Sequence, residues 1–352
     1  MSRSIEALGV EIAGSASAFP LDVGIGHELS NEDAYRELLG PDWSNELTRR
    51  GWSSTHPADA WGVQTRQWLG APGRPETAQG DAADLALGAA GSALDDAGVE
   101  PGDIELLIVA TSTPARLSST IASRLACDLG IEAGALDQRA GGVGGLAAIA
   151  SACTYLNAGL ANALVVASEA LSPVLDPSDL GNALIFGDGA AALVLRTCDA
   201  PDRGLVLGRF GNASIDGRAF TVPGQLPPTW GDLQAGSFVF QSPDAAYREG
   251  VNELRLSVAT ELGAEARARG VAIDVAVPYA PTAGHARSQA EALGVPLERV
   301  LSLRERHGCL GAADGLAAID EARRTSRLVP GQGLAATAVA GGVAWGSLLW
   351  RS

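Results

Sequence analysis

The chain of 352 residues contains no lysine, so all 25 of its basic residues are arginine. Schiff-base chemistry, pyridoxal-phosphate attachment and the lysine of a P-loop are therefore excluded. Positive charge is also scarce, because 41 acidic residues leave a formal net charge of −16. A chain of this charge lacks the clustered basic surface on which nucleic-acid binding depends, so we expect no nucleic-acid partner.

Cysteine is the next scarce residue, with Cys127, Cys153, Cys198 and Cys309 widely spaced along the chain. They form no CxxC pair, so we expect neither a metal site nor a secreted disulfide framework. The first residues lack a basic segment followed by a long apolar run, and the apolar stretch Leu334–Trp350 is interrupted by glycines. We therefore expect no signal peptide and no membrane contact, and we predict a cytoplasmic protein.

The chain is rich in hydrophobic residues, and one hydrophobic segment occurs twice. Hydrophobic residues make up 46% of the chain, and the segment Gly-Leu-Ala-Ala-Ile stands at 145–149 and again at 315–319. Each copy follows a helical stretch and a short apolar strand, which lie at 81–98 and 104–110 in the first half and at 245–270 and 273–277 in the second. Short apolar strands that alternate with helices predict parallel sheets covered on both faces.

The sequence thus predicts an α/β protein of two duplicated halves, with two mostly parallel sheets layered with helices. The first half is 1–200, with an irregular insert at 20–80, and the second half is 201–352. The insert and the stretch 200–250 contain proline, glycine and tryptophan. Long loops of this kind usually carry function.

A glycine-rich turn at 141–145 precedes an apolar helix at 146–160. Backbone N–H groups at such a helix N-terminus stabilise an anion or a developing oxyanion. One interpretation is a dinucleotide-binding fingerprint, because 142–147 fits G-x-G-x-x-A and Glu169 ends the next strand. The polar segment before the turn and its place in the middle of the chain disfavour this interpretation.

Five segments, at 62–66, 84–111, 185–190, 307–308 and 341–347, support a second interpretation. From about Gly62 to its C-terminus the chain resembles the ketoacyl-ACP synthase III proteins of the thiolase superfamily. The resemblance implies a duplicated thiolase-like fold with the layers αβαβα. It also implies action on acyl-CoA or acyl-carrier-protein thioesters, no separate cofactor, and a dimer formed through the central sheet.

The family's chemistry uses a cysteine nucleophile, a histidine and an asparagine, and the resemblance implies that all three are replaced here. The cysteine position falls on Gly142, the histidine position on Tyr279 and the asparagine position on Cys309. Gly142 cannot form an acyl-enzyme, and a tyrosine with an ordinary pKa of about 10 is a poor base at pH 7 but a hydrogen-bond donor. An oxyanion site formed by the N–H groups of Gly142, Gly341 and Gly342 would remain.

Other candidate residues have two interpretations each. Cys309 is either a relocated nucleophile whose pKa is lowered by a helix N-terminus, or a small buried residue. Arg139 either binds a carboxylate or phosphate, or pairs with Asp137. Arg66 and Trp61 complete the predicted substrate-binding residues. The family often holds the nucleotide of coenzyme A with a tryptophan and an arginine, and only the tryptophan is found, which leaves coenzyme A and a carrier protein open.

Three functions follow from these observations. The first is an enzyme of polyketide-like or fatty-acid-like specialised metabolism that transfers or cyclises an acyl group without decarboxylation, with Tyr279 and Cys309 as candidate catalytic residues. The second is an inactive subunit that pairs with an active ketosynthase. The third is a dinucleotide-binding protein. A homodimer or a heterodimer with a related chain is expected for the first two.

Overall fold

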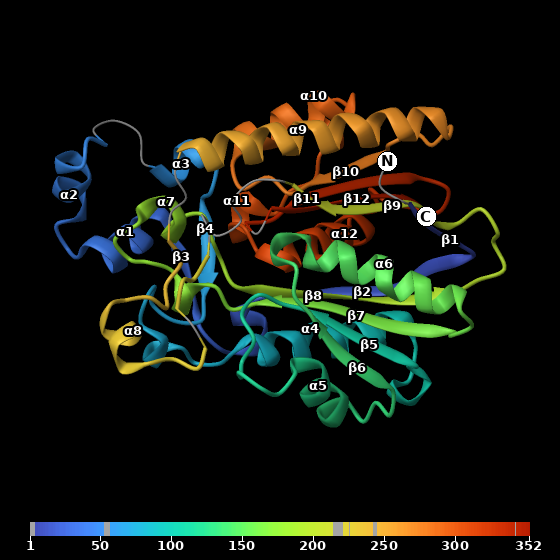
Figure 1. Ribbon diagram of the computed structural model, residues 1–352, viewed down its shortest axis with the longest axis horizontal. Helices are drawn as coiled ribbons and strands as arrows, with labels where there is room; N and C mark the ends of the chain where they lie inside the picture. The colour runs from blue at the N-terminus through green and yellow to red at the C-terminus, as the bar shows by residue number, and fades with distance from the viewer. Residues whose placement is uncertain (1–3, 53–56, 214–220, 225, 242–244, 342) are drawn as a thin grey trace.

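The computed structural model describes residues 4–52, 57–213, 221–224, 226–241, 245–341 and 343–352. Their helices and strands form five layers, helix, sheet, helix, sheet and helix (Figure 1). This arrangement confirms the predicted α/β layering.

Two five-stranded sheets form the framework of these layers. The first has the order β2 (Val10–Ala18), β8 (Gly189–Thr197), β7 (Asn162–Glu169), β5 (Leu106–Ala110) and β6 (Gly134–Gln138). The second has the order β1 (Ile5–Leu8), β9 (Gly204–Asn212), β12 (Ala344–Arg351), β11 (Gly333–Val339) and β10 (Val275–Pro278). The beginning of the chain thus completes the second sheet.

Both sheets are mixed, which corrects the prediction of mostly parallel sheets. In the first sheet β5 is parallel to β6 and β7, but β8 is antiparallel to β7 and β2. In the second sheet β10 and β11 are parallel, and the other pairs are antiparallel. The connection 340–343 between β11 and β12 shows the physical reason, because a short connection permits only antiparallel pairing.

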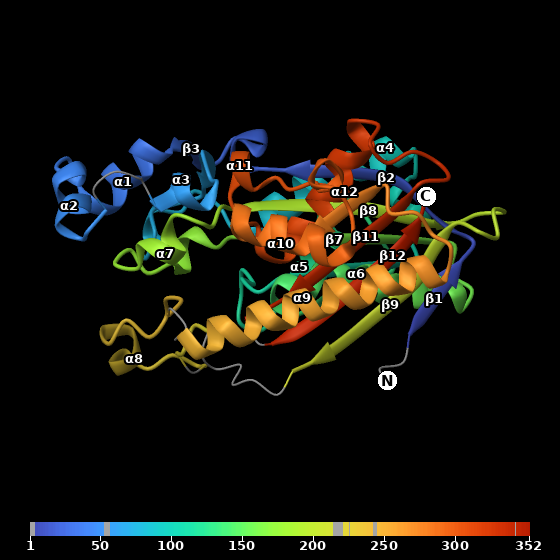
Figure 2. The same ribbon diagram turned by 90° about the horizontal axis from the view of Figure 1, so that it is seen from above.

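The helices of the three helical layers lie as the repeat predicts (Figures 1 and 2). The outer face of the first sheet is covered by α4 (Ala82–Ala97) and α5 (Ile121–Leu129), the space between the sheets holds α6 (Gly144–Asn157) and α12 (Asp314–Arg324), and the second sheet is covered by α9 (Ala245–Ala268) and α10 (Ala283–Leu293). The remaining elements are α1 (Asn31–Leu39), α2 (Trp43–Arg49), α3 (Pro57–Trp61), α7 (Leu180–Ala183), α8 (Trp230–Gln234), α11 (Arg304–His307), β3 (His27–Ser30) and β4 (Thr65–Trp68).

Helix α4 shows how local sequence sets the limits of these elements. The Asp81 carboxylate accepts a hydrogen bond from the N–H of Ala83 at 2.8 Å and caps the first turn. Gly98 ends the helix in the left-handed region with φ 60°, a conformation that glycine adopts without strain.

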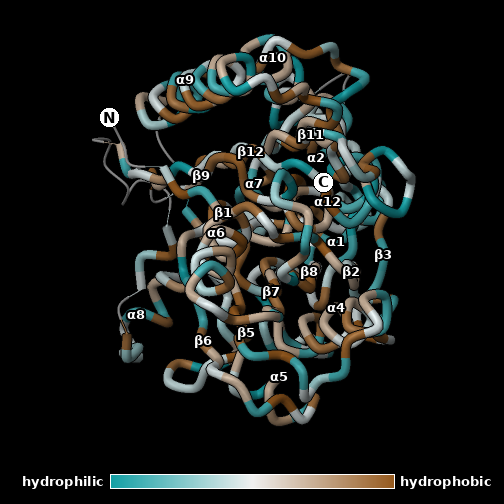
Figure 3. Tube along the Cα trace, turned by 90° about the vertical axis from the view of Figure 1, so that its right-hand side faces the viewer, coloured by the Kyte–Doolittle hydropathy of each residue, from teal (hydrophilic) through white to brown (hydrophobic). Residues whose placement is uncertain are grey.

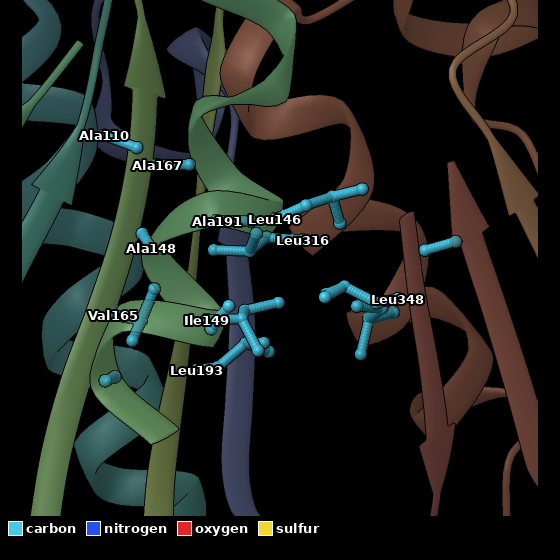
Figure 4. Packing of buried hydrophobic residues seen from close by; sticks show 14 of the residues in the cluster. Ala110, Leu146, Ala148, Ile149, Val165, Ala167, Ala191, Leu193, Leu316 and Leu348 are labelled. Carbon is cyan, nitrogen blue, oxygen red and sulfur yellow. The ribbon is translucent and has the colours of Figure 1, made fainter. Parts of the chain in front are cut away.

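The two central helices pack against each other through the repeated segment. A Cβ added at Gly145 would lie 2.7 Å from Cδ1 of Leu316, and one added at Gly315 would lie 3.1 Å from Cδ2 of Leu146. The glycine of each copy therefore receives the leucine of the other, and Figure 4 shows Leu146 and Leu316 facing one another between the sheets.

The largest apolar cluster lies between the sheets, around these two helices. Figure 3 shows hydrophobic stretches along β5, β7 and α4, which belong to this cluster and to the one on the outer face of the first sheet. Within the described part of the chain, no helix is long and apolar enough to cross a membrane.

Candidate active site

Three segments meet at the N-terminal ends of the central helices. Two are the short turns Gly141–Val143 before α6 and Gly311–Ala313 before α12, which contact each other. Each turn begins with a left-handed glycine, with φ +55° at Gly141 and +58° at Gly311. The third segment is Tyr279, which directly follows β10. The duplicated turns thus bring residues 142 and 279 together.

The Tyr279 ring occupies the space beside Gly142. A Cβ added at Gly142 would lie 3.0 Å from Cζ of Tyr279 and 3.2 and 3.3 Å from Cε2 and Cε1. Favourable contact between carbon atoms begins at about 3.5 Å. The ring would therefore have to shift by a few tenths of an ångström to admit even a Cβ at position 142. The Tyr279 backbone is held in turn, because its N–H donates to the Thr337 carbonyl at 2.7 Å and its carbonyl accepts from the Gln289 amide at 3.1 Å.

Cys309 lies on the other side of the same phenol. Its thiol donates to the Tyr279 hydroxyl at 3.1 Å, and the residue is only 2% exposed. The sulfur packs among apolar side chains such as Leu171 and Phe186, and this burial raises the pKa of Cys309 to about 12. The expectation that a helix N-terminus lowers the pKa of this thiol is wrong, because an apolar environment disfavours the thiolate.

Tyr279 lies in the wall of two cavities. The first cavity, of about 330 Å³, is lined by Trp61, Arg255 and His285 among others. The second cavity, of about 250 Å³, has Gly142 and other residues in its wall. Tyr279 and Gly341 line both cavities, whereas Cys309 lines neither.

The second cavity contains a buried carboxyl group that the sequence did not single out for catalysis. Both oxygens of Glu169 accept from the N–H of Ser112 at 3.0 Å, and one also accepts from the Thr113 hydroxyl at 2.7 Å. The N–H of Ala312 donates to the other oxygen at 3.3 Å. Burial raises the pKa of Glu169. This carboxyl group ties the ends of β5 and β7 to the turn before α12.

The same contacts oppose the dinucleotide interpretation. Glu169 points into the protein, whereas the fingerprint needs its carboxylate for a ribose. A Cβ added at Gly145 would collide with the Ala312 carbonyl, and one at Gly144 would lie 3.4 Å from the Ala312 side chain. The first turn of α6, which holds Gly144 of the fingerprint, therefore packs against the second half of the protein and leaves little space for a pyrophosphate.

Comparison with known proteins gives the family. Models of 3-oxoacyl-[acyl-carrier-protein] synthase III and of its C-terminal part match residues 136–211 and 264–352. A β-ketoacyl-[acyl-carrier-protein] synthase III from Bordetella petrii is 33% identical over 97% of this chain and 97% of its own. The chain belongs to the β-ketoacyl-[acyl-carrier-protein] synthase III family.

Two further comparisons agree. A protein of the same name from Neisseria meningitidis is 33% identical over 76% of this chain and 82% of its own length. The crystal structure of 3-oxoacyl-(acyl carrier protein) synthase III from Pseudomonas aeruginosa PAO1 superimposes with a TM-score of 0.80 at 27% identity, and the match covers 98% of both chains. The thiolase-like fold of the synthase III family is thereby confirmed for this chain.

The predicted substrate-binding residues of this synthase III family member lie in different places. Trp61 lines the first cavity and Arg139 the second. Arg139 is exposed and donates to the Ser112 carbonyl at 3.3 Å. It does not pair with Asp137, whose carboxylate accepts from two backbone N–H groups of α5 at 2.9 Å each.

Arg66 lies apart from the cavities. It is fully buried, and its guanidinium donates to the Ser30 carbonyl at 3.3 Å, to Asn31 Oδ1 at 2.7 Å and to the Leu184 carbonyl at 3.0 Å. It lines neither of these two cavities. These bonds tie β4 to β3 and to the end of α7, so the observed contacts of Arg66 are structural.

The structure describes two of the three residues predicted to form the oxyanion site. Gly142 and Gly341 line the second cavity, and the Gly341 carbonyl accepts a hydrogen bond from the Tyr247 hydroxyl. Gly342 lies outside the described residues. No group of His, Cys, Asp and Glu among the described residues is arranged to hold a metal ion.

Two residues of the first cavity, Arg255 and His285, were not predicted as site residues from the sequence. The ring nitrogen Nδ1 of His285 lies 2.9 Å from Oγ1 of Thr282. Burial, with smaller contributions from Arg255 and Arg304, lowers the pKa of His285 to about 4. His285 is therefore neutral at pH 7. The sequence indicates only that each residue lies in a helix, which does not distinguish a cavity residue from a surface residue.

Proposed function

We propose that this synthase III family member acts on acyl-CoA or acyl-carrier-protein thioesters of polyketide-like or fatty-acid-like metabolism. It transfers or cyclises the acyl group, without an acyl-enzyme at position 142 and without decarboxylation. The observation that carries the proposal is the Tyr279 ring beside Gly142, 3.0 Å from where a Cβ would lie. This ring takes the space that the side chain of a nucleophile at 142 would need.

Without a nucleophile on the protein, the acyl group moves directly. A hydroxyl or amine of the acceptor, or of the acyl chain itself in a cyclisation, attacks the thioester carbonyl carbon. The carbon–sulfur bond breaks, and the leaving thiol takes up the proton that the attacking group loses. The N–H groups of Gly142 and Gly341 are the proposed donors to the oxyanion.

Tyr279 is the proposed hydrogen-bond donor in this reaction. Burial, reinforced by Cys309, raises the pKa of Tyr279 well above its ordinary value, so the phenol is neutral at pH 7. It therefore donates a hydrogen bond to the carbonyl oxygen or the leaving sulfur and does not remove a proton. Cys309 helps to hold the phenol through the 3.1 Å hydrogen bond between its thiol and the Tyr279 hydroxyl.

A second candidate is an inactive subunit of a dimer with a related ketosynthase. It needs a surface for a second chain, and the edge of the first sheet offers one, because β6 pairs only with β5 among the described strands. A cavity of about 770 Å³ lies beside this edge and is lined by Gln138, Arg139 and Trp345 among others. An unpaired edge strand is a ready template for pairing with another chain.

The test is thiol release and intact mass of the purified protein with a panel of acyl-CoA and acyl-carrier thioesters. We expect thiol release without a mass adduct, a rate that Tyr279→Phe lowers at least tenfold, or ~1.4 kcal/mol of barrier, and a Cys309→Ala variant that keeps most of the rate. A mass adduct that disappears in Cys309→Ala would overturn the direct transfer. If neither thiol release nor a mass adduct is observed, the inactive subunit is favoured.

A further inference from the structure

We infer that the first cavity binds a carboxylate carried by the substrate, and that Arg255 is the residue that binds it. This inference deepens the proposed function and rests on it, because it names the chemical class of substrate for the same site. The evidence is an arginine with unused hydrogen-bond donors, the charge of the cavity wall, and the position of the arginine beside Tyr279.

Arg255 projects from α9 into the first cavity. Its Nη1 donates to Asn252 Oδ1 at 2.6 Å, and its Nε is buried with no hydrogen-bond partner. A guanidinium carries five N–H donors, and this one forms no ion pair with any described residue. The residue is half-buried, and burial lowers the pKa of Arg255, an effect that a neighbouring anion would oppose. An anion bound in the cavity would supply the missing partner.

The wall of the first cavity is cationic although the chain is strongly acidic. Its described lining residues include Arg248 and Arg255 and no aspartate or glutamate, against a formal net charge of −16 for the whole chain. His285 in the same wall is neutral at pH 7 because its pKa is about 4. The cavity therefore attracts negatively charged groups.

The position of Arg255 places the anion near the reacting atoms. Arg255 and Tyr279 line the same cavity, and the charge of Arg255 acts to lower the pKa of both Tyr279 and Cys309. Asn252 fixes one Nη atom and leaves the remaining N–H groups for a ligand. A planar fork of this kind suits a carboxylate, which it binds with two parallel hydrogen bonds. The carboxylate belongs either to the acyl group or to the acceptor.

The first arm of the experiment compares the dissociation constants of succinyl-CoA and butyryl-CoA, whose acyl groups have the same carbon number and differ by the carboxylate. If the acyl group carries it, the wild-type protein binds succinyl-CoA at least tenfold more tightly. Arg255→Gln brings the two constants within about twofold, and Arg255→Lys keeps part of the preference. Arg267→Gln is the matched control, because Arg267 is an exposed arginine of the same helix and its loss changes the net charge equally.

The second arm compares free succinate with succinamide by calorimetry, with and without butyryl-CoA. If the acceptor carries the carboxylate, succinate binds at least tenfold more tightly than succinamide, and Arg255→Gln removes the difference. No preference for the carboxylate in either arm, or a preference that Arg255→Gln retains, would overturn the inference. Failure of both thioesters to bind while succinate binds would overturn the proposed function alone, and the thermal unfolding midpoint of each variant shows that it is folded.

Discussion

Gly142 and Tyr279 form a complementary pair, and this predicts the result of a double-mutant cycle. In Gly142→Ala the new methyl group would lie 3.0 to 3.3 Å from three ring atoms of Tyr279, against an optimum of about 3.5 to 4.0 Å. Overpacking of this kind costs about 1 to 3 kcal/mol in the free energy of unfolding. We therefore expect Gly142→Ala to be destabilised by that amount.

The same substitution made in a Tyr279→Ala variant shows whether the tyrosine ring causes this loss of stability. In Tyr279→Ala the ring is absent, so Gly142→Ala should cost less than about 0.5 kcal/mol, and the coupling energy of the cycle should exceed about 1 kcal/mol. Tyr279→Phe is the matched control, since it keeps the ring and therefore the full cost. The free energies come from urea unfolding at pH 7. Equal costs of Gly142→Ala in the wild-type and Tyr279→Ala backgrounds would refute the proposed steric exclusion.

Three other predictions concern residues around the site. Alkylation of the folded protein at pH 8 should modify the exposed Cys127 and leave the buried Cys309, whose pKa is about 12; peptide mapping by mass spectrometry would contradict this if Cys309 reacted first. Arg66→Met should lower the free energy of urea unfolding by about 3 kcal/mol, because it removes three hydrogen bonds of a buried guanidinium; a loss below about 1 kcal/mol would show that they contribute little. Burial raises the pKa of Asp314 to about 6 from 3.8, so the folded state binds the proton more tightly and this residue's contribution to stability falls as the pH rises from about 4 to about 6. Asp314→Asn should therefore be up to about 3 kcal/mol more stable than wild type at pH 7.5 and no more stable at pH 3.5; a gain of the same size at both pH values would contradict the assignment.

Local sequence predicted much of the fold. Asp81 and Gly98 mark the ends of α4 because capping is decided by the few residues at a helix end. The two Gly-Leu-Ala-Ala-Ile segments predicted a pair of equivalent helices, and these are the central ones. The hydrophobic pattern did not predict that β8 and β12 run antiparallel to their neighbours, since apolar strands of either direction have the same composition. The prediction of mostly parallel sheets therefore failed.

The candidate site was only partly predictable for a similar reason. Resemblance of short motifs picked out Gly142, Tyr279 and Cys309, and these three lie in contact. The burial of the Cys309 thiol depends on Leu171 and Phe186, which are distant in sequence, so the effect of burial on its pKa was not accessible from spacing. Arg255 was missed because an arginine on a long polar helix looks like any solvated charge until the cavity beneath it is known.

The reciprocal contact of the central helices, with Gly145 against Leu316 and Gly315 against Leu146, has a consequence for how such a protein changes over time. A larger residue in place of either glycine collides with the other copy, so the helix bodies can change only in matched pairs. The turns that precede the helices line the second cavity with Gly142 and Gly311 and take no part in this exchange of leucines. Residues outside the helix bodies that face the cavities, such as Tyr279 after β10, can therefore change while the helix bodies preserve the duplicated framework.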